Sequence, residues 1–475
     1  MPSQTPLDDL ASFIRQLDAG TLTSVLIDLA ADHAVVHDRL VRLQLSNQPK
    51  ALATVFRKKL VAWKRSTKYV DYSRVGEFGR ELHAWLEQVE HELMPRDPPE
   101  AMALAEAFIQ GDEVFFNRAD DSTGVIGAAV RTACMLWLKA ASHCESPPSA
   151  WPDRITTLVA ADQYGAREEL LRRSDLLLSE EALRGLVSSC EAQLDDAFER
   201  PPAAPARVNW PASRASTALS LLSEALRDPD VLVRAMLSHS PSPNPIQKST
   251  LAEAFLKYGR PEGALTWLEG SWAHLESTRR HLHAQALAAL GRTGEAAVER
   301  QQIFEANLAV WDLHAWLDLL APHEQAPAIE RARELASAHV NPTVVALLLM
   351  DIGDDTAAEV ALMSDPAAIQ GRDYGTLVPL AEALERKGLW TGATLVYRAL
   401  LVAILDRAYA PAYHHAERYW ARLAALAPNY TGPCLESPEE FEARIRVQHK
   451  RKSSFWAHVS GARRADDDLP DDADE

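Results

Sequence analysis

Apolar residues recur along most of the chain at the spacing of an amphipathic helix. Residues 10–17 place their apolar side chains on one face, and the stretch from Phe78 to Leu93 repeats the pattern until Pro95. Positions i, i+3, i+4 and i+7 share one helix face, so each apolar stripe needs a second helix to cover it. Alternation at a period of two is almost absent, and alanine and leucine, both strong helix formers, dominate. The sequence therefore predicts an all-α fold.

Two proline-rich stretches interrupt the helical pattern. Residues 200–211 hold four prolines and residues 238–245 hold three. Proline removes a backbone donor and keeps the preceding residue out of the helical region, so both stretches favour breaks. We expect an irregular helical N-terminal domain over 1–200, a repeat domain over 213–460, and a disordered acidic tail over 461–475.

An internal repeat follows the second break. Four segments each contain an apolar helix, a glycine, a four-residue turn and an alanine; the glycine–alanine pairs are Gly259 with Ala264, Gly291 with Ala296, Gly353 with Ala358, and Gly388 with Ala393. Glycine suits a left-handed helix end, and alanine allows two helices to approach closely.

The spacing of these glycines sets the period of the repeat. They are 32, 62 and 35 residues apart, so the longest interval predicts two periods with a degenerate unit near 319–329. Tetratricopeptide repeats have a period of about 34 residues and a helix–turn–helix shape. We therefore predict an α-solenoid, a tetratricopeptide-like superhelix of antiparallel helical pairs.

Two further stretches carry a family resemblance. TKYVDYSRVGEFGRELHAWLEQVEHEL is followed by VFFNRADDSTGVIGAAVRTACMLWL, and YHHAERYWARLAALA by FEARIRVQHKRKSSFW. In these stretches the chain resembles an uncharacterised bacterial family of all-helical proteins, a domain of unknown function, over most of residues 1–460. Some relatives carry SWIM-type zinc-finger labels, but the Cys-x-Cys and Cys-x-His pairs of such a finger are absent here. The resemblance implies a helical fold and no particular activity.

Charge and composition narrow the classes of function. The 475 residues carry a net charge of −18, and seven carboxylates fall in the stretch from Asp466 to the end. A protein with this excess of negative charge is not expected to coat nucleic acid or an anionic lipid surface, because like charges repel. We found no run of about 18 apolar residues and no signal-peptide pattern, so we expect no membrane span. Four scattered cysteines (134, 144, 190 and 434) predict neither a disulfide framework nor a zinc site, and favour the cytoplasm.

A basic segment stands out against this acidity. Between Arg57 and Arg74 there are seven basic residues and one acid. Five of the basic residues gather toward one helix face, opposite Leu60 and Trp63: Arg57, Lys58, Lys64, Arg65 and Lys68. Such a patch could bind an acidic partner, a phosphate backbone with Tyr69 and Tyr72 stacking on bases, or the chain's own tail. The alternative is a solvated helix face paired with acidic neighbours.

Two smaller groups of residues suggest chemistry. Glu113, Arg118, Asp120 and Asp121 surround a tight turn and could form a polar site for acid–base work, although helix capping explains Asp121 equally. His33 and His37, four residues apart, would share a helix face and could bind a divalent metal. A pair alone is a weak metal signal, so we expect neither a metal nor a cofactor.

The C-terminal part offers a polar cluster and a closing helix. Tyr413, His414, Glu417 and Arg418 could line the groove of a superhelix, or pack between helices. Ser437 begins a capping box, and we expect Phe455 and Trp456 to fold back as an apolar cap on the last repeat.

The function that these patterns favour is interaction. Phosphate-loop, nucleophile-elbow and kinase motifs are missing from the sequence. We expect a non-enzymatic scaffold or adaptor that binds a protein or peptide on a helical-repeat surface. The alternatives are nucleic-acid association through the patch at 57–74 and an enzyme with a polar site around Arg118, Asp120 and Asp121.

Overall fold

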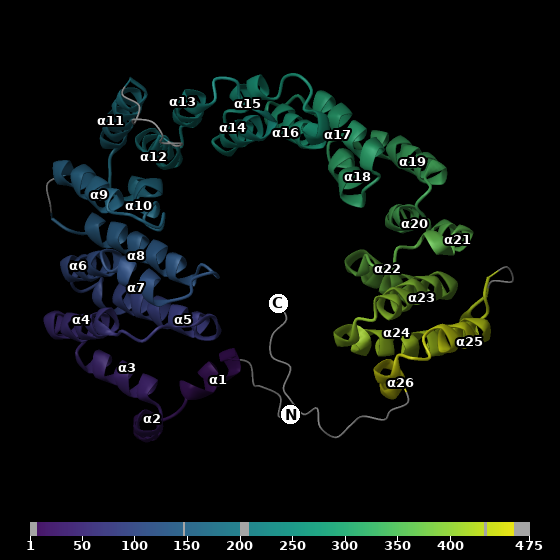
Figure 1. Ribbon diagram of the computed structural model, residues 1–475, viewed down its shortest axis with the longest axis horizontal. Coiled ribbons are helices and arrows are strands. Elements are labelled where there is room, and N and C mark those ends of the chain that lie inside the picture. Colours follow the sequence, from purple (N-terminus) through teal and green to yellow (C-terminus); the bar gives the residue numbers. More distant parts are fainter. Residues whose placement is uncertain (1–6, 146–147, 200–208, 432–434, 460–475) are drawn as a thin grey trace. The chain divides into compact units, whose positions relative to one another are not determined.

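The protein folds into helices throughout the part of the chain that its computed structural model describes, residues 7–145, 148–199, 209–431 and 435–459 (Figure 1). Among these residues the only β-type pairing is an isolated bridge between Val70 and Ala119. The all-α prediction is confirmed. The predicted acidic tail, and Cys434, lie outside the described residues.

The chain divides into two compact units, Met1–Gln247 (unit 1) and Lys248–Glu475 (unit 2). The helices of unit 1 are α1 (Leu7–Ile14), α2 (Ala19–Asp32), α3 (Ala34–Gln44), α4 (Pro49–Arg65), α5 (Tyr72–Gln88), α6 (Pro98–Ile109), α7 (Asp112–Arg118), α8 (Val125–Ser142), α9 (Trp151–Ala160), α10 (Glu169–Arg172), α11 (Glu180–Glu199), α12 (Trp210–Leu226) and α13 (Pro229–His239). The helices α11 and α12 pack against each other on either side of residues 200–208, where a domain boundary was expected.

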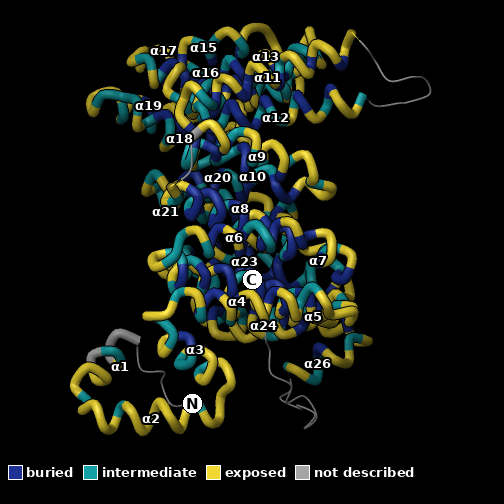
Figure 2. Tube along the Cα trace, turned by 90° about the vertical axis from the view of Figure 1, so that its left-hand side faces the viewer, coloured by how far each residue is buried: buried dark blue, intermediate teal, exposed yellow. Residues whose placement is uncertain are grey.

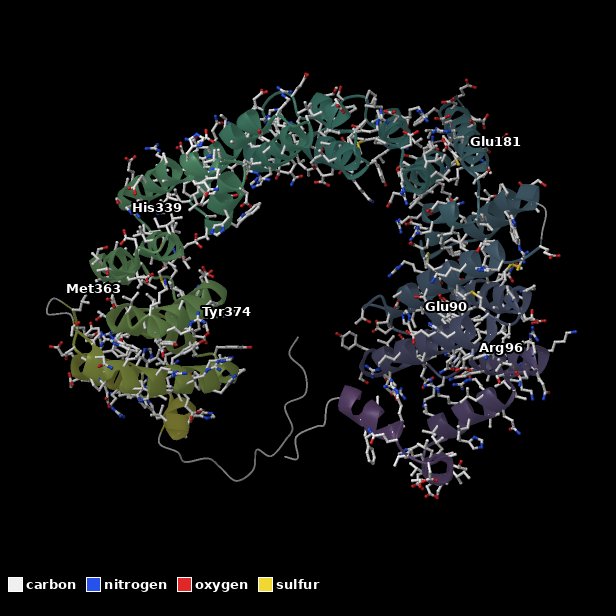
Figure 3. All side chains as sticks on the ribbon, turned by 180° about the vertical axis from the view of Figure 1, so that it is seen from behind. Glu90, Arg96, Glu181, His339, Met363 and Tyr374 are labelled. Atoms are coloured by element: carbon white, nitrogen blue, oxygen red, sulfur yellow. The ribbon has the colours of Figure 1, made fainter. Side chains whose placement is uncertain are left out.

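Unit 1 has its core around α8. Eleven residues of this helix are buried, and α5, α6 and α10 pack against it. By length and composition alone α8 would suit a membrane, a property that our search for an apolar run missed. Its apolar character here serves the core, which also contains Trp85 stacked on Phe108 with ring centroids 5.7 Å apart. Outside this core lie charged side chains such as Glu90, which pairs with Lys139 at 2.6 Å (Figure 3).

The helix α14 (Pro245–Lys257) crosses the division between the units. The remaining helices of unit 2 are α15 (Pro261–Trp267), α16 (Glu276–Ala289), α17 (Thr293–Asn307), α18 (Val310–Leu317), α19 (Pro322–Ala338), α20 (Pro342–Asp351), α21 (Asp355–Ser364), α22 (Tyr374–Arg386), α23 (Trp390–Arg407), α24 (Tyr413–Leu426), α25 (Pro438–Gln448) and α26 (Ser453–Val459). From α14 to α23 they follow one another as five helix–turn–helix pairs, and α18–α19 occupies the long interval between glycines.

Each glycine of the sequence repeat ends the first helix of a pair in the left-handed conformation. The φ angles of Gly259, Gly291, Gly353 and Gly388 are 70°, 72°, 81° and 75°. The residue after each glycine donates its N–H to a carbonyl five residues back, as Arg292 does to Leu287 at 2.9 Å. This is the Schellman arrangement of a helix end. The four repeat alanines are completely buried, as expected where two helices approach closely.

Substituting Gly291 by alanine is expected to destabilise unit 2 by about 1 kcal/mol, because a left-handed φ is unfavourable for any residue with a Cβ. Open space surrounds a Cβ built at Gly291, so the cost is conformational and not steric. Gly294→Ala is the matched control: its surroundings are equally open and its φ is not positive. Denaturant unfolding followed by circular dichroism measures both variants, and equal effects would contradict the assignment.

Candidate functional site

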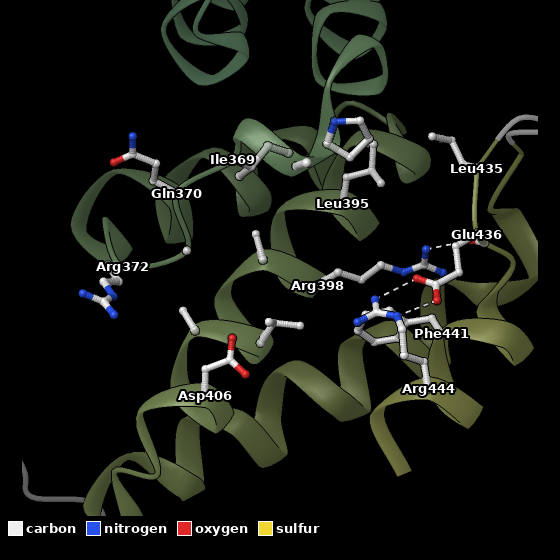
Figure 4. Close-up of a pocket in the computed structure, with 16 residues that line it drawn as sticks. Ile369, Gln370, Arg372, Leu395, Arg398, Asp406, Leu435, Glu436, Phe441 and Arg444 are labelled. Atoms are coloured by element: carbon white, nitrogen blue, oxygen red, sulfur yellow. Dashed lines mark hydrogen bonds and ion pairs between the residues drawn. The ribbon is translucent and has the colours of Figure 1, made fainter. Parts of the chain in front are cut away.

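A groove in unit 2, which we call the α23 groove, has a volume of about 630 Å³ (Figure 4). Three segments line it: the loop 366–372 between α21 and α22, one face of α23, and residues 435–444 at the start of α25. Its floor is apolar and is formed by Ala399, Val402 and Ala403 of α23. The groove therefore combines a smooth helical floor with two walls from distant parts of the sequence.

The loop 366–372 lies directly on α23 because of Gly371. A Cβ at this position would overlap the carbonyl oxygen of Ala399, and only glycine leaves the room for so close an approach. Asp365 starts the loop by accepting a hydrogen bond from the Ala368 N–H at 3.3 Å. Ile369 then turns inward and is buried in the core of unit 2.

Arg398 is the central charged residue of the groove. Its side chain leaves α23 and is only 7% exposed. The guanidinium lies 4.7 Å from the ring centroid of Tyr430 and 4.5 Å from that of Phe441. Its Nη1 donates to the Glu436 carbonyl oxygen at 2.7 Å, while its Nε is buried and makes no hydrogen bond within the described chain. Burial lowers the pKa of Arg398 because it disfavours the charged form.

The nearby carboxylate of Glu436 is committed to a different arginine. Arg444 donates to both of its oxygens, at 2.7 and 2.8 Å. The hydrogen bond from Arg444 lowers the pKa of Glu436 and in turn raises that of Arg444. Among the described residues, no carboxylate lies within ion-pair distance of Arg398. The groove thus holds a buried cation that has no direct carboxylate partner among the described residues, although the nearby charge of Glu436 acts on it electrostatically.

The other charges of the groove lie at its rim. Arg372 is exposed on the loop, and the exposed Asp406 lies at the end of α23, 3.5 Å from His449. Serine, threonine, cysteine, histidine, lysine and tyrosine are all missing from the described lining. The ionisable groups of the described lining are the carboxylates of Asp406 and Glu436 and the guanidinium groups of three arginines. Guanidinium groups can bind a carboxylate or a phosphate.

The basic patch predicted on α4 divides into engaged and free side chains. Arg57 pairs with Glu100 at 2.5 Å. Lys64 donates to the Ala107 carbonyl oxygen at 3.3 Å, near the end of α6. Lys58 and Arg65 are exposed on the helix, whereas Lys68 lies beyond its end.

Leu60 is buried on the opposite face of α4, as the pattern predicted. Tyr69 and Tyr72 are both exposed. The binding role of this patch stays a prediction.

The residues of the predicted polar turn serve separate helix ends. Arg118 donates to the carbonyl oxygens of Trp63 and Ser66, at 2.7 and 3.3 Å, and so caps the C-terminal end of α4. Asp121 accepts from the N–H groups of Ile126 and Gly127, at 2.8 and 3.1 Å, at the start of α8.

The remaining members of that turn do not converge with them. Asp120 accepts from the Ser122 N–H at 3.2 Å, and Glu113 is exposed in the first turn of α7. The capping role considered for Asp121 is confirmed, and an acid–base role for the group stays untested.

The two candidate metal-binding histidines do not share a helix face, so that expectation is wrong. The helix α2 ends at Asp32 and α3 begins at Ala34, with His33 between them at φ −125° and ψ 106°. His37 is exposed, and its ring lies 3.5 Å from the carboxylate of Asp38. Nowhere in the described chain do three metal-ligating side chains come together.

The polar cluster predicted on α24 spreads over two faces of that helix. Tyr413 is buried against Phe455, with ring centroids 6.0 Å apart, and Glu417 faces His458 at 3.4 Å. His414 and Arg418 are exposed, and both contact His415. None of these residues lines the α23 groove.

The residues of the α23 groove were missed by the sequence analysis. One signal was present: Arg398 interrupts an otherwise apolar helix between Leu395 and Ile404. A charge at such a position needs a partner or a special environment. Phe455 and Trp456 fold back onto the protein as expected: Phe455 is fully buried and both rings pack on Trp420 of α24, the helix that follows the last predicted repeat.

Comparison with known proteins places the chain in a family but gives no activity. No curated protein matches the sequence. The family of unknown function DUF6880 matches residues 3–458, nearly the whole chain. This agrees with the resemblance that the sequence motifs carried and with the all-helical structure. The chain therefore belongs to DUF6880, a family of unknown function.

Proposed function

We propose that this protein is a non-enzymatic interaction scaffold that binds an acidic segment of a partner protein in the α23 groove. The observation that carries the proposal is the buried guanidinium of Arg398 in a groove of about 630 Å³, without a carboxylate partner in the described chain. An incoming carboxylate would neutralise this charge and form charge-assisted hydrogen bonds. Arg372 at the rim would add a second donor.

The shape of the groove favours a peptide as the ligand. Its floor of alanine and valine side chains can accept an apolar residue, and the arginines can accept an acidic residue nearby. Peptide-binding grooves commonly combine apolar pockets with a few charged anchors. The partner is therefore a protein or peptide, and no cofactor is needed.

The repeat architecture supports the same proposal. We assign the helical pairs within residues 213–460 to a tetratricopeptide-like solenoid on the strength of their period, their Schellman glycines and their buried alanines. Solenoids of helical pairs typically present extended binding surfaces. We place the protein in the cytoplasm, because Cys134 and Cys190 are free thiols.

A displayed library of random peptides, selected on the full-length protein, tests this function. Acidic peptides are expected to be enriched. Their affinity should fall at least tenfold for Ala403→Trp, which fills the floor of the groove with an uncharged side chain that excludes the ligand. Ala288→Trp, at an equally half-buried position on α16, is the control and should bind normally.

Arg398→Met tests the charge separately. The loss of a charge-assisted contact, at about 1.5–3 kcal/mol, corresponds to a decrease in affinity of roughly ten- to a hundredfold for acidic peptides. Neutral peptides should lose much less. Selected peptides that bind Ala403→Trp as tightly as the natural protein would exclude the α23 groove as their site.

A further inference from the structure

The first three helices of unit 1 leave an unusual number of apolar side chains in water. Nine of the twenty-four exposed large hydrophobic side chains of the described chain lie within residues 10–43. Phe13, Ile27 and Val35 are 58%, 60% and 78% exposed. The helix α2 has no buried residue; Leu22 and Ala30 are half-buried, and Figure 2 shows the helix mostly exposed.

These helices are attached to unit 1 through α3. Arg42 of α3 is buried and pairs with Glu92 at 2.8 Å, and Leu45 packs against the core. The helix α2 packs on α3 and extends away from the rest of the unit (Figure 1). The apolar surface therefore lies at the N-terminal end of the stack of helices.

The end of a helical stack normally needs a cover. In stacked helical proteins the terminal elements carry a polar outer face, because nothing else shields them from water. At the other end of the chain, Phe455 of α26 fills this role by burying itself against α24. The N-terminal end lacks such a cover in the described structure. On α2 the exposed side chains of Val25, Leu26 and Leu29 share one helix face, and an exposed apolar face of this kind typically marks an interface.

We propose that a second copy of this chain covers α1, α2 and the exposed side of α3, so that the protein is a two-fold symmetric dimer joined through its N-terminal helices. At roughly half exposure each of the nine exposed apolar side chains of these three helices presents on the order of 100 Å², which together approach the ~800 Å² per partner of a standard interface. Two identical ends that lack a cover can close each other in an isologous contact, which leaves no free end.

The charges of unit 1 favour a second copy over a membrane. Residues 7–32, which hold α1, α2 and the turn between them, contain five aspartates and a single arginine, Arg15. Interfacial membrane helices instead carry basic side chains that bind anionic lipids. The same unit exposes Lys58 and Arg65 on α4. A two-fold contact can place the acidic helices of each copy against the basic face of the other, twice per dimer.

Light scattering coupled to size exclusion, on the full chain, tests the proposal. The expected mass is twice 52.4 kDa. The double variant Phe13→Asp, Ile27→Asp should run at the monomer mass, because burying two unpaired carboxylates in the interface raises the dissociation constant at least about a hundredfold. Both positions are exposed, so its helix content by circular dichroism should be unchanged. Val360→Asp, at a similarly exposed position on α21, should remain dimeric.

A second variant tests the charge arrangement. Lys58→Glu with Arg65→Glu is expected to raise the dissociation constant about tenfold at low salt, and less at high salt where charges are screened. A natural chain that stays monomeric up to about 100 µM would overturn the dimer, as would a Phe13→Asp, Ile27→Asp variant that stays dimeric. Binding of a monomeric chain to phosphatidylserine vesicles, lost in the same variant, would assign the surface to membranes instead.

Discussion

Replacement of Arg167 by methionine is expected to destabilise unit 1 by about 3–5 kcal/mol, because it leaves a buried carboxylate without its partner. Arg167 and Asp112 are 6% and 2% exposed and form two hydrogen bonds of 2.8 Å each. The Arg167 Nη1 also donates to the Leu158 carbonyl oxygen at 2.9 Å. The hydrogen bonds that Arg167 donates to Asp112 raise the pKa of Arg167.

Hydrogen exchange in increasing denaturant measures this effect for unit 1 separately from unit 2. Arg184→Met is the control: this arginine pairs with Glu180 on the surface, and the loss should be within about 1 kcal/mol. The double variant Arg167→Met, Asp112→Leu should recover part of the loss, because it removes the unpaired charge as well. An effect of Arg167→Met as small as that of the control would show that the pair is not structural.

The second large effect is expected for Phe455→Ala, with a loss of about 3–5 kcal/mol in the stability of the C-terminal part of unit 2. Phe455 is fully buried and touches three aromatic rings, those of Tyr413, Trp420 and Trp456. Truncation opens a cavity that these rigid rings cannot fill. The helix α24, which α26 covers, should then exchange its amide hydrogens faster.

Val447→Ala is the matched control for this variant. Val447 lies on the neighbouring α25 and is largely exposed, so its truncation should change stability by less than about 0.5 kcal/mol. If α24 exchanged at the natural rate in Phe455→Ala, the closing role of α26 would be refuted.

The sequence predicted those features that depend on neighbouring residues. Gly291 ends a helix because its left-handed φ is favourable only for glycine. Ser437 caps α25 in a reciprocal box with Glu440, and Asp121 caps α8, because these hydrogen bonds join residues three to six positions apart. Each requires only the local chain, so the residue pattern is sufficient. One local feature was not predicted: the apolar pattern gives no sign that α2 ends and α3 begins at His33.

The tertiary structure decided where distant residues meet. Arg118 was expected beside Asp121 from its place in the chain, but its hydrogen bond reaches Trp63, 55 positions away. The α23 groove needs the loop 366–372, α23 and residues 435–444 to come together, and no periodicity in the sequence specifies that encounter. The periodicity of apolar residues predicts that a helix face must be covered. It does not predict which segment covers it, because many pairings of apolar faces bury similar areas. Side-chain shape and the fit of residues such as Gly371 against Ala399 select one of them.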